Sequence, residues 1–227
     1  MSDETEEQKK LMRQIDISCV QAFHTMDEID AMVELAKKYR LAAVFTLPAF
    51  SAHVAERLQD TREIHAGGVV SFPGGGDTTG QKKQAKELWE AGCREIDMVM
   101  NLTAFRSHEF SYVKEELLAI REQVPSAIFK VIIEAPQLTE QEICQAVDLC
   151  VKGRADYVKT STGWYPGCPS TVEQVRIMSR EAAGRIQIKA AGGIRSLETI
   201  QEMQKAGCSR FGMGMRSVQN LIKSIYK

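Results

Sequence analysis

Eight short apolar segments recur along this chain of 227 residues and limit its fold more than any other feature. They are strand-like in composition and begin at Gln14, Ala42, Gly67, Glu95, Ile128, Ala155, Ile186 and Ser209. Their starts are separated by roughly 23 to 33 residues, which is the length of one strand, one helix and two short loops. The spacing predicts strands and helices that alternate along the whole chain.

The segments between these strands carry apolar residues at the period of an α-helix. The clearest cover residues 27–39, 81–91, 112–123, 139–151 and 171–183. Two of them are expected to begin with capping boxes, Thr139 with Glu142 and Ser170 with Glu173. Eight strand–helix units fit either a closed (β/α)₈ barrel or an open doubly wound sheet. Because no linker-like segment interrupts them, we expect residues 1–227 to form a single domain, with residues 1–12 as a charged amino-terminal extension or helix.

The charge balance and the cysteines exclude several classes of protein. The chain has 29 Lys and Arg against 30 Asp and Glu, so charge gives no reason to expect a nucleic acid or an anionic membrane as a partner. The six cysteines include no CxxC pair and no Cys/His cluster with zinc-like spacing. The amino terminus, MSDETEEQKK, lacks the pattern of an export signal, and no apolar run is long enough for a membrane span. We therefore expect a cytoplasmic protein with reduced thiols, no metal, and neither nucleic acid nor membrane as a partner.

The charged residues within the strand segments favour the closed barrel. Side chains alternate between the two faces of a strand, and the outer face of a barrel must pack against helices. With the apolar positions facing outward, the inward-facing charged residues are Asp16, Asp97, Lys130, Glu134, Lys159 and Lys189. Buried ions are costly unless they are paired, so such a set must be mutually paired or functional. Barrel active sites lie at the carboxyl ends of the strands, where we expect Asn101, Glu134, Lys159 and Lys189.

Six segments carry a resemblance to a known family. They are GGVVSFPGG, AGCREIDMVMN, FKVIIE, ADYVKTSTG, IKAAGGIR and SRFG, which run in order from residue 67 to residue 212. In these segments the sequence resembles the deoxyribose-phosphate aldolases, which are class I aldolases that use a lysine Schiff base rather than a metal. The resemblance implies a (β/α)₈ barrel, no cofactor, a role in carbohydrate catabolism, and a homo-oligomer, either a dimer or a tetramer.

The resemblance also implies roles for single residues. Lys159 corresponds to the Schiff-base lysine, Lys189 to its cationic neighbour and Asp97 to the acid/base carboxylate, while Asp16 and Lys130 fall on a supporting polar network. These residue types suit the chemistry, because only a neutral amine attacks a carbonyl, and at the reference pKa only about 0.04% of a lysine is neutral at pH 7. Burial beside a second ammonium lowers such a pKa. Two alternatives stay open: Lys130 is a structural partner of a carboxylate, and Asp97 is only the counter-ion of buried lysines.

The sequence departs from the family pattern at the phosphate site. The positions that the family places around a phosphate are Gly163, Gly192, Gly193, Ile194, Arg195 and Gly212, and the turn continues through Gly214 and Arg216. The family usually has a Gly-x-Ser-Ser turn after its last strand, whereas residues 212–216 read Gly-Met-Gly-Met-Arg. Either Arg216 and the extra glycine rebuild an anion site, since an arginine fork suits phosphate, or the substrate carries no phosphate there. In the second strand, Phe45 occupies a position that is often Cys in the family.

We therefore expect reversible cleavage of 2-deoxyribose 5-phosphate to acetaldehyde and glyceraldehyde 3-phosphate through a Schiff base on Lys159. The first alternative is a related Schiff-base aldolase that acts on a different or non-phosphorylated sugar or aldehyde. The second is a non-catalytic ligand-binding barrel, since fold does not fix function. A third is a barrel isomerase or metal-dependent lyase that shares only the phosphate loops. The combination of Asp97, Lys159 and Lys189 argues against the second, and the lack of a plausible His cluster disfavours a metal enzyme.

Overall fold

A closed barrel of eight parallel strands forms the centre of the molecule. The computed structural model describes residues 5–226, in which the strands follow one another around the barrel in chain order and the last pairs with the first. They are β1 (Ile15–Cys19), β2 (Ala43–Thr46), β3 (His65–Val70), β4 (Glu95–Val99), β5 (Ile128–Ile132), β6 (Tyr157–Lys159), β7 (Gln187–Ala191) and β8 (Arg210–Gly214). Each overlaps one of the predicted strand segments. The prediction of a (β/α)₈ barrel is confirmed.

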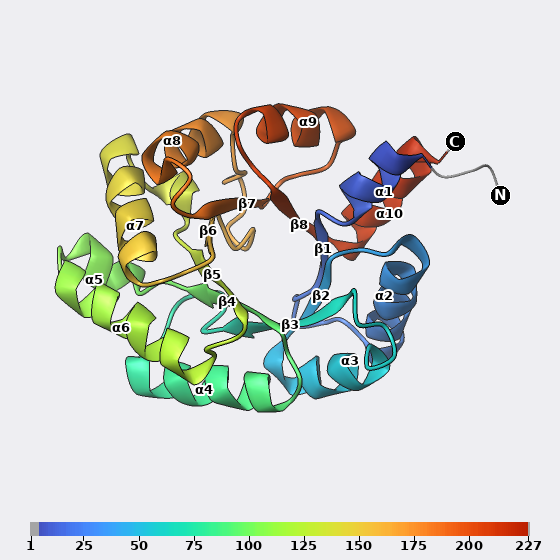
Figure 1. Cartoon of the computed structure of the whole chain (residues 1–227), viewed down its shortest axis with the longest axis horizontal. Helices are drawn as coiled ribbons and strands as arrows, with labels where there is room; N and C mark the ends of the chain where they lie inside the picture. The colour runs from blue at the N-terminus through green and yellow to red at the C-terminus, as the bar shows by residue number, and fades with distance from the viewer. Residues whose placement is uncertain (1–4, 227) are drawn as a thin grey trace.

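Helices surround the barrel and cover its outer face (Figure 1). They are α1 (Glu6–Met12), α2 (Met26–Tyr39), α3 (Ser51–Arg57), α4 (Thr78–Glu90), α5 (Leu102–Arg106), α6 (Phe110–Gln123), α7 (Glu140–Lys152), α8 (Val172–Ala182), α9 (Leu197–Lys205) and α10 (Met215–Ile225), with short 3₁₀ helices η1 (Pro48–Phe50) and η2 (Ala135–Gln137). Of the expected extension over residues 1–12, residues 1–4 lie outside the described part of the chain. Helix α1 packs beside α10 (Figure 1), and the Gln8 side-chain amide donates to the Ile225 carbonyl. No helix within residues 5–226 is long and apolar enough to cross a membrane.

The starts of two helices test how well local sequence sets a helix boundary. Thr139 begins α7 with a complete capping box, as predicted. The capping box predicted for Ser170 and Glu173 is wrong, because α8 begins one residue later, with Thr171 as its N-cap and Gln174 as the reciprocal partner. Both boxes fit the sequence, and tertiary contacts decide between them: Ser170 is buried, and its hydroxyl donates to a carbonyl of β7.

Strand register places the charged side chains inside the barrel. Outward-facing residues such as Ile17 and Ile96 are fully buried in the large apolar cluster between strands and helices. On the inner face, Asp97 of β4 is the register partner of Lys130 of β5, and Lys159 of β6 is the partner of Lys189 of β7. Because neighbouring parallel strands present these positions to the same side, their side chains meet inside the barrel.

Candidate active site

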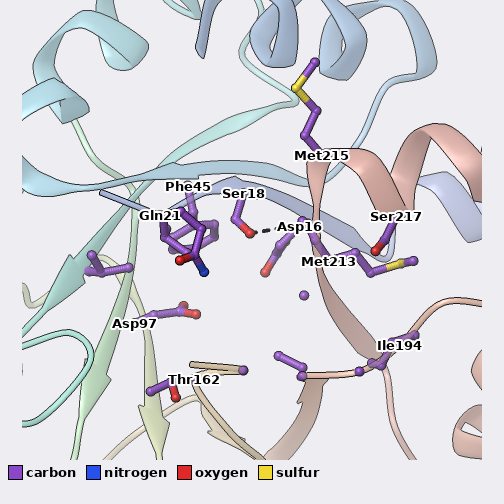
Figure 2. Close-up of a pocket in the computed structure, with 18 of the residues that line it drawn as sticks. Asp16, Ser18, Gln21, Phe45, Asp97, Thr162, Ile194, Met213, Met215 and Ser217 are labelled. Carbon is purple, nitrogen blue, oxygen red and sulfur yellow. Dashed lines mark hydrogen bonds between the residues drawn. The ribbon is translucent and has the colours of Figure 1, made fainter. Parts of the chain in front are cut away.

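A cavity of about 300 Å³ opens at the carboxyl-terminal end of the barrel. Figure 2 shows Phe45 and Asp97 on one side of it and Ser217, near the start of α10, on the other. Lys130 is fully buried and does not line the cavity. All the other predicted site residues line it: Asp16, Asp97, Lys159, Gly163, Lys189, Gly192, Gly193, Ile194, Arg195, Gly212, Gly214 and Arg216.

Three lysine side chains converge on the buried carboxylate of Asp97. The Lys159 Nζ donates to Asp97 Oδ2 at 2.8 Å, and the Lys189 Nζ donates to the same oxygen at 2.6 Å. The Lys130 Nζ donates to Oδ1 at 3.1 Å. Lys159 is 7% exposed, against 1% for Lys189 and 0% for Lys130. Lys159 is therefore the amine that a ligand in the cavity reaches most easily.

The mutual pairing shifts the protonation equilibria of these groups. Burial by itself would raise the pKa of Asp97, but the three ammonium groups hold it well below its usual value. Burial lowers the pKa of Lys189 to about 8, against the opposing effect of the nearby carboxylates. Burial also opposes the charge on Lys130, yet Asp97 and Glu95 keep the pKa of Lys130 above its usual value. The charged form of Lys130 is therefore favoured, whereas Lys189 can change its protonation state near neutral pH.

Two further charged residues, Glu95 and Arg210, lie in the barrel interior and are absent from the predicted set. Glu95 is fully buried and accepts hydrogen bonds from the Lys130 ammonium and from the Arg210 guanidinium. The Arg210 Nε also donates to Asp16 Oδ1 at 2.6 Å. Both residues stand at the first position of their strands and have inward parity. That parity is the sequence signal that could have found them.

The expectation that Glu134 joins the interior charges is wrong. Strand β5 ends two residues earlier, and Glu134 adopts a left-handed conformation with φ 52°, so strand alternation no longer sets its direction. Its carboxylate instead accepts hydrogen bonds from the backbone N–H of Thr162 at 3.1 Å and from the hydroxyl at 2.7 Å. Asn101, two residues beyond the end of β4, caps α5 instead of lining the cavity. Strand parity predicts direction only within a strand.

Glycines form the cavity wall made by the loops after β6 and β7. Gly192 has φ +91°, and a Cβ there would lie 2.3 Å from the Ser161 Oγ and 3.2 Å from the Cα of Gly163. Gly163 itself has φ +70°. Only glycine accepts this backbone geometry and this close approach. The wall therefore presents backbone instead of bulky side chains, and backbone N–H groups are suited to bind an anion.

The turn after β8 completes this wall and supplies a hydroxyl that the sequence pattern did not indicate. Gly214 is the N-cap of α10, and Arg216 and Ser217 in the first turn of that helix line the cavity. The first N–H groups of a helix have no intrahelical partner. Ser217 stands two residues after the position of the second serine in the family's Gly-x-Ser-Ser turn. A hydroxyl is thus present at this end of the cavity although both family serines are replaced.

Phe45 forms an apolar side of the cavity next to the lysines. Its ring centroid lies 4.4 Å from the Lys189 Nζ and 4.8 Å from the Lys130 Nζ, within the range of cation–π attraction. Gly67 on the next strand makes room for the ring, because a Cβ there would lie 2.4 Å from it. An aromatic face that attracts both ammonium groups thus stands where the family often has a thiol.

These groups define the chemistry that the site can perform. It offers an amine at the floor of a cavity, a neighbouring amine that titrates near neutral pH, and a backbone-rich wall suited to an anion. Within residues 5–226, no group of three or more His, Cys, Asp or Glu side chains is placed to hold a metal ion. Fold and site together define the class as a (β/α)₈ barrel equipped for amine chemistry on a carbonyl compound.

Comparisons with known proteins identify the family. The model of the DeoC/LacD family of aldolases matches residues 2–222. The deoxyribose-phosphate aldolase of Klebsiella pneumoniae is 39% identical over 219 residues, which cover 95% of this chain and 88% of that enzyme. The enzyme of the same name from Aquifex aeolicus is 39% identical over 199 residues, which cover 87% of this chain and 89% of that enzyme. The chain belongs to the DeoC/LacD family of aldolases and is a carbon–carbon lyase.

Solved structures are similar over the whole barrel. An aldolase named QR15 superposes with a TM-score of 0.89 at 34% identity, covering 100% of this chain and 97% of its own. A tetrameric deoxyribose phosphate aldolase from Aeropyrum pernix superposes with a TM-score of 0.88 at 25% identity, covering 96% of this chain and 92% of its own. The resemblance found in the sequence is confirmed at the level of family and fold.

Proposed function

We propose that this aldolase reversibly cleaves 2-deoxyribose 5-phosphate into acetaldehyde and glyceraldehyde 3-phosphate through a Schiff base on Lys159. The main support is the pair of amines in the cavity: Lys159 and Lys189 both donate hydrogen bonds to Oδ2 of Asp97. The names of the relatives support the substrate. The glycine-rich wall with Arg216 supports a phosphate at one end of it.

The reaction begins with the neutral amine of Lys159, which adds to the C1 aldehyde of the open-chain sugar. The carbinolamine loses water and becomes an iminium ion, which withdraws electrons from the C2–C3 bond. A base removes the proton of the C3 hydroxyl, a carbonyl forms at C3, and the electron pair of the broken C2–C3 bond becomes the enamine. The enamine then takes a proton at C2, and water hydrolyses the resulting iminium to acetaldehyde and free Lys159.

Lys189 is the group best suited to carry these protons, and Asp97 orients it. A proton carrier works best when its pKa lies near the operating pH, and the pKa of Lys189 is lowered to about 8, chiefly by burial. Three lysine ammonium groups hold the pKa of Asp97 well below its usual value, so Asp97 is ionised in the free enzyme. This favours the counter-ion role of Asp97, with protons passing between Lys189 and the substrate directly or through a water molecule.

The two walls of the cavity orient the substrate in this proposal. Phe45 and Val69 pack together as an apolar side of the cavity, and Arg216 and Ser217 line it from the first turn of α10. Figure 2 shows Phe45 and Ser217 on opposite sides of the cavity. The two-carbon donor on Lys159 then lies toward Phe45, and the phosphate lies at the turn after β8. If the glycine-rich wall with Arg216 does not bind phosphate, the substrate is a non-phosphorylated sugar or aldehyde.

Reductive trapping tests the proposed nucleophile. Acetaldehyde with borohydride is expected to leave one reduced two-carbon adduct, which peptide mapping places on Lys159. An unchanged intact mass contradicts the Schiff base and favours a non-catalytic barrel. For the substrate, the comparison is between deoxyribose 5-phosphate and free deoxyribose. A preference for the phosphorylated sugar below about tenfold in kcat/KM, or about 1.4 kcal/mol, contradicts a working phosphate site.

We also propose that the enzyme is a homo-oligomer, a dimer or a tetramer, that works in the cytoplasm on small molecules without a nucleic-acid or membrane partner. The tetrameric relative from Aeropyrum pernix supports an oligomer. All six cysteines lie within the described residues as free thiols, which supports a reducing compartment. Light scattering of the purified protein checks the oligomer, and a monomeric mass at micromolar concentration contradicts it.

A further inference from the structure

The interior charges of the barrel form a closed ring in which positive and negative groups alternate. Each member contacts the next, and the ring runs Asp97, Lys130, Glu95, Arg210, Asp16, Lys189 and back to Asp97. The contact between Asp16 Oδ2 and the Lys189 Nζ, at 2.6 Å, is an ion pair outside hydrogen-bond geometry. The Arg210 side chain is the most exposed member at 13%. The ring is therefore shielded from bulk water.

Charge is balanced within this ring, and Lys159 is an additional cation attached to it. Three carboxylates alternate with three cations, while Lys159 contacts Asp97 from outside the ring. A surplus ammonium ion in a buried cluster is costly, so the cluster favours the state in which one of the two amines on Asp97 Oδ2 is neutral. Arg210 cannot supply that neutral group, because a guanidinium does not lose its proton in proteins.

We propose that Glu95 and Arg210 are positioning residues that set, through the charge balance of the ring, the pH dependence of Schiff-base formation in the cavity. Neither residue lines the cavity, so neither acts on the substrate directly. Arg210 engages the carboxylates of Asp16 and Glu95, and without it both carboxylates attract the protons of the lysines. Without the charge of Glu95, the cluster holds a larger positive surplus and releases a proton more readily. This inference rests on the proposed Schiff base at Lys159.

Other titratable groups lie close to the ring. The His65 Nδ1 of β3 lies 2.9 Å from Glu95 Oε1, Tyr157 of β6 lies near Arg210, and Cys208, which precedes β8 and packs in the apolar cluster outside the strands, lies near Lys189. Burial raises the pKa of Tyr157 and raises that of Cys208 to about 12, so both stay neutral between pH 6 and 9. The variant His65→Gln removes the imidazole next to Glu95 and shows whether this contact contributes to the pH dependence of trapping.

The test measures the rate of reductive trapping of acetaldehyde on Lys159 as a function of pH. Arg210→Gln is expected to move the pH of half-maximal rate upward by about one pH unit, and Glu95→Gln is expected to move it downward by a similar amount. Arg210→Lys keeps the charge and is expected to restore the wild-type midpoint. Arg121→Gln is the matched control, because Arg121 is similarly shielded, at 14% side-chain exposure, and pairs with Asp156 outside the ring. Because the same reductant is used with every variant, the pH dependence of the reductant itself cancels when the variants are compared.

The outcomes distinguish the inference from the proposed function. Trapping on Lys159 with no shift in either variant, or with shifts in the same direction, overturns the role of the ring and leaves the Schiff base intact. Absence of trapping on Lys159 in the wild-type enzyme overturns the proposed function. Thermal melting checks that each variant is folded. If Arg210→Gln is unfolded, the downward shift of Glu95→Gln decides, and its absence overturns the inference.

Discussion

Two parts of the site differ in construction. The charged floor consists of Asp97 and the three lysines around it, and the anion wall consists of the glycine-rich loops after β6 and β7 with the turn through Arg216. On the floor, buried charges on strands pair with one another, and Asp97 accepts hydrogen bonds from three lysines. On the wall, glycine backbone and exposed side chains meet, and within residues 5–226 neither Arg195 nor Arg216 forms an ion pair. A change on the floor leaves a buried charge without a partner, whereas a change in the exposed turn costs little stability. The exposed turn after β8 therefore tolerates substitution more readily than the charged floor does.

The largest effect in this comparison is expected from the floor, at Lys159. Lys159→Leu removes the proposed nucleophile and is expected to reduce kcat by more than about 10⁴-fold, because Lys189, which also lines the cavity, is only 1% exposed against 7% for Lys159. Steady-state kinetics and thermal melting check this result. Lys152→Leu is the control, since Lys152 is an exposed lysine of α7 that pairs with Asp148. Substantial activity in Lys159→Leu assigns the nucleophile to another residue.

The charge of Asp97 is expected to control the stability of the floor. Asp97→Asn leaves three buried ammonium groups without their shared counter-ion and is expected to lower the free energy of unfolding by roughly 3–5 kcal/mol. Denaturant titration measures this change. Glu173→Gln, which breaks an exposed ion pair with Arg176, is expected to change stability by less than about 1 kcal/mol. Equal effects of the two substitutions show that the free energy of unfolding does not depend on the charge of Asp97.

The wall is expected to depend on backbone geometry at Gly192. Gly192→Ala introduces a Cβ at φ +91° against the Ser161 hydroxyl and is expected to lower the free energy of unfolding by about 1–3 kcal/mol. It is also expected to raise KM more than it lowers kcat. Gly214→Ala is the control for stability, because a Cβ there meets no atom within 4 Å and φ is −65°. A stable Gly192→Ala enzyme with unchanged KM contradicts the role of this loop in binding.

The smallest effect is expected from a substitution in the exposed turn after β8. Arg216→Gln is expected to reduce the preference for deoxyribose 5-phosphate over free deoxyribose by about tenfold in kcat/KM, without a change in stability. Helix N–H groups and Ser217 remain to bind the anion. Competition between the two sugars measures the preference directly, and Arg176→Gln serves as a surface control. An unchanged ratio shows that Arg216 does not contact the phosphate.

Much of the fold and of the floor could be predicted from the sequence, because the signals are local. Alternation along a strand indicates which residues face inward, and it correctly placed Asp97, Lys130 and Lys189 inside the barrel. The same rule failed for Glu134, where the strand had already ended and the backbone turned left-handed. Short helices such as α3 and α5 lack enough turns to show a period, so the sequence pattern did not indicate them.

The sequence by itself determined the alternation of strands and helices, the inward lysines and the glycine-rich wall, since each depends on residues close together in the chain. Only the tertiary structure decided which charges meet. Glu95 and Arg210 are 115 residues apart, and Asp16 and Arg210 are 194 residues apart, yet each pair is in contact once β8 closes against β1. The energy of an ion pair depends on the distance between the charges and on the exclusion of water, and the order of the residues along the chain fixes neither of them.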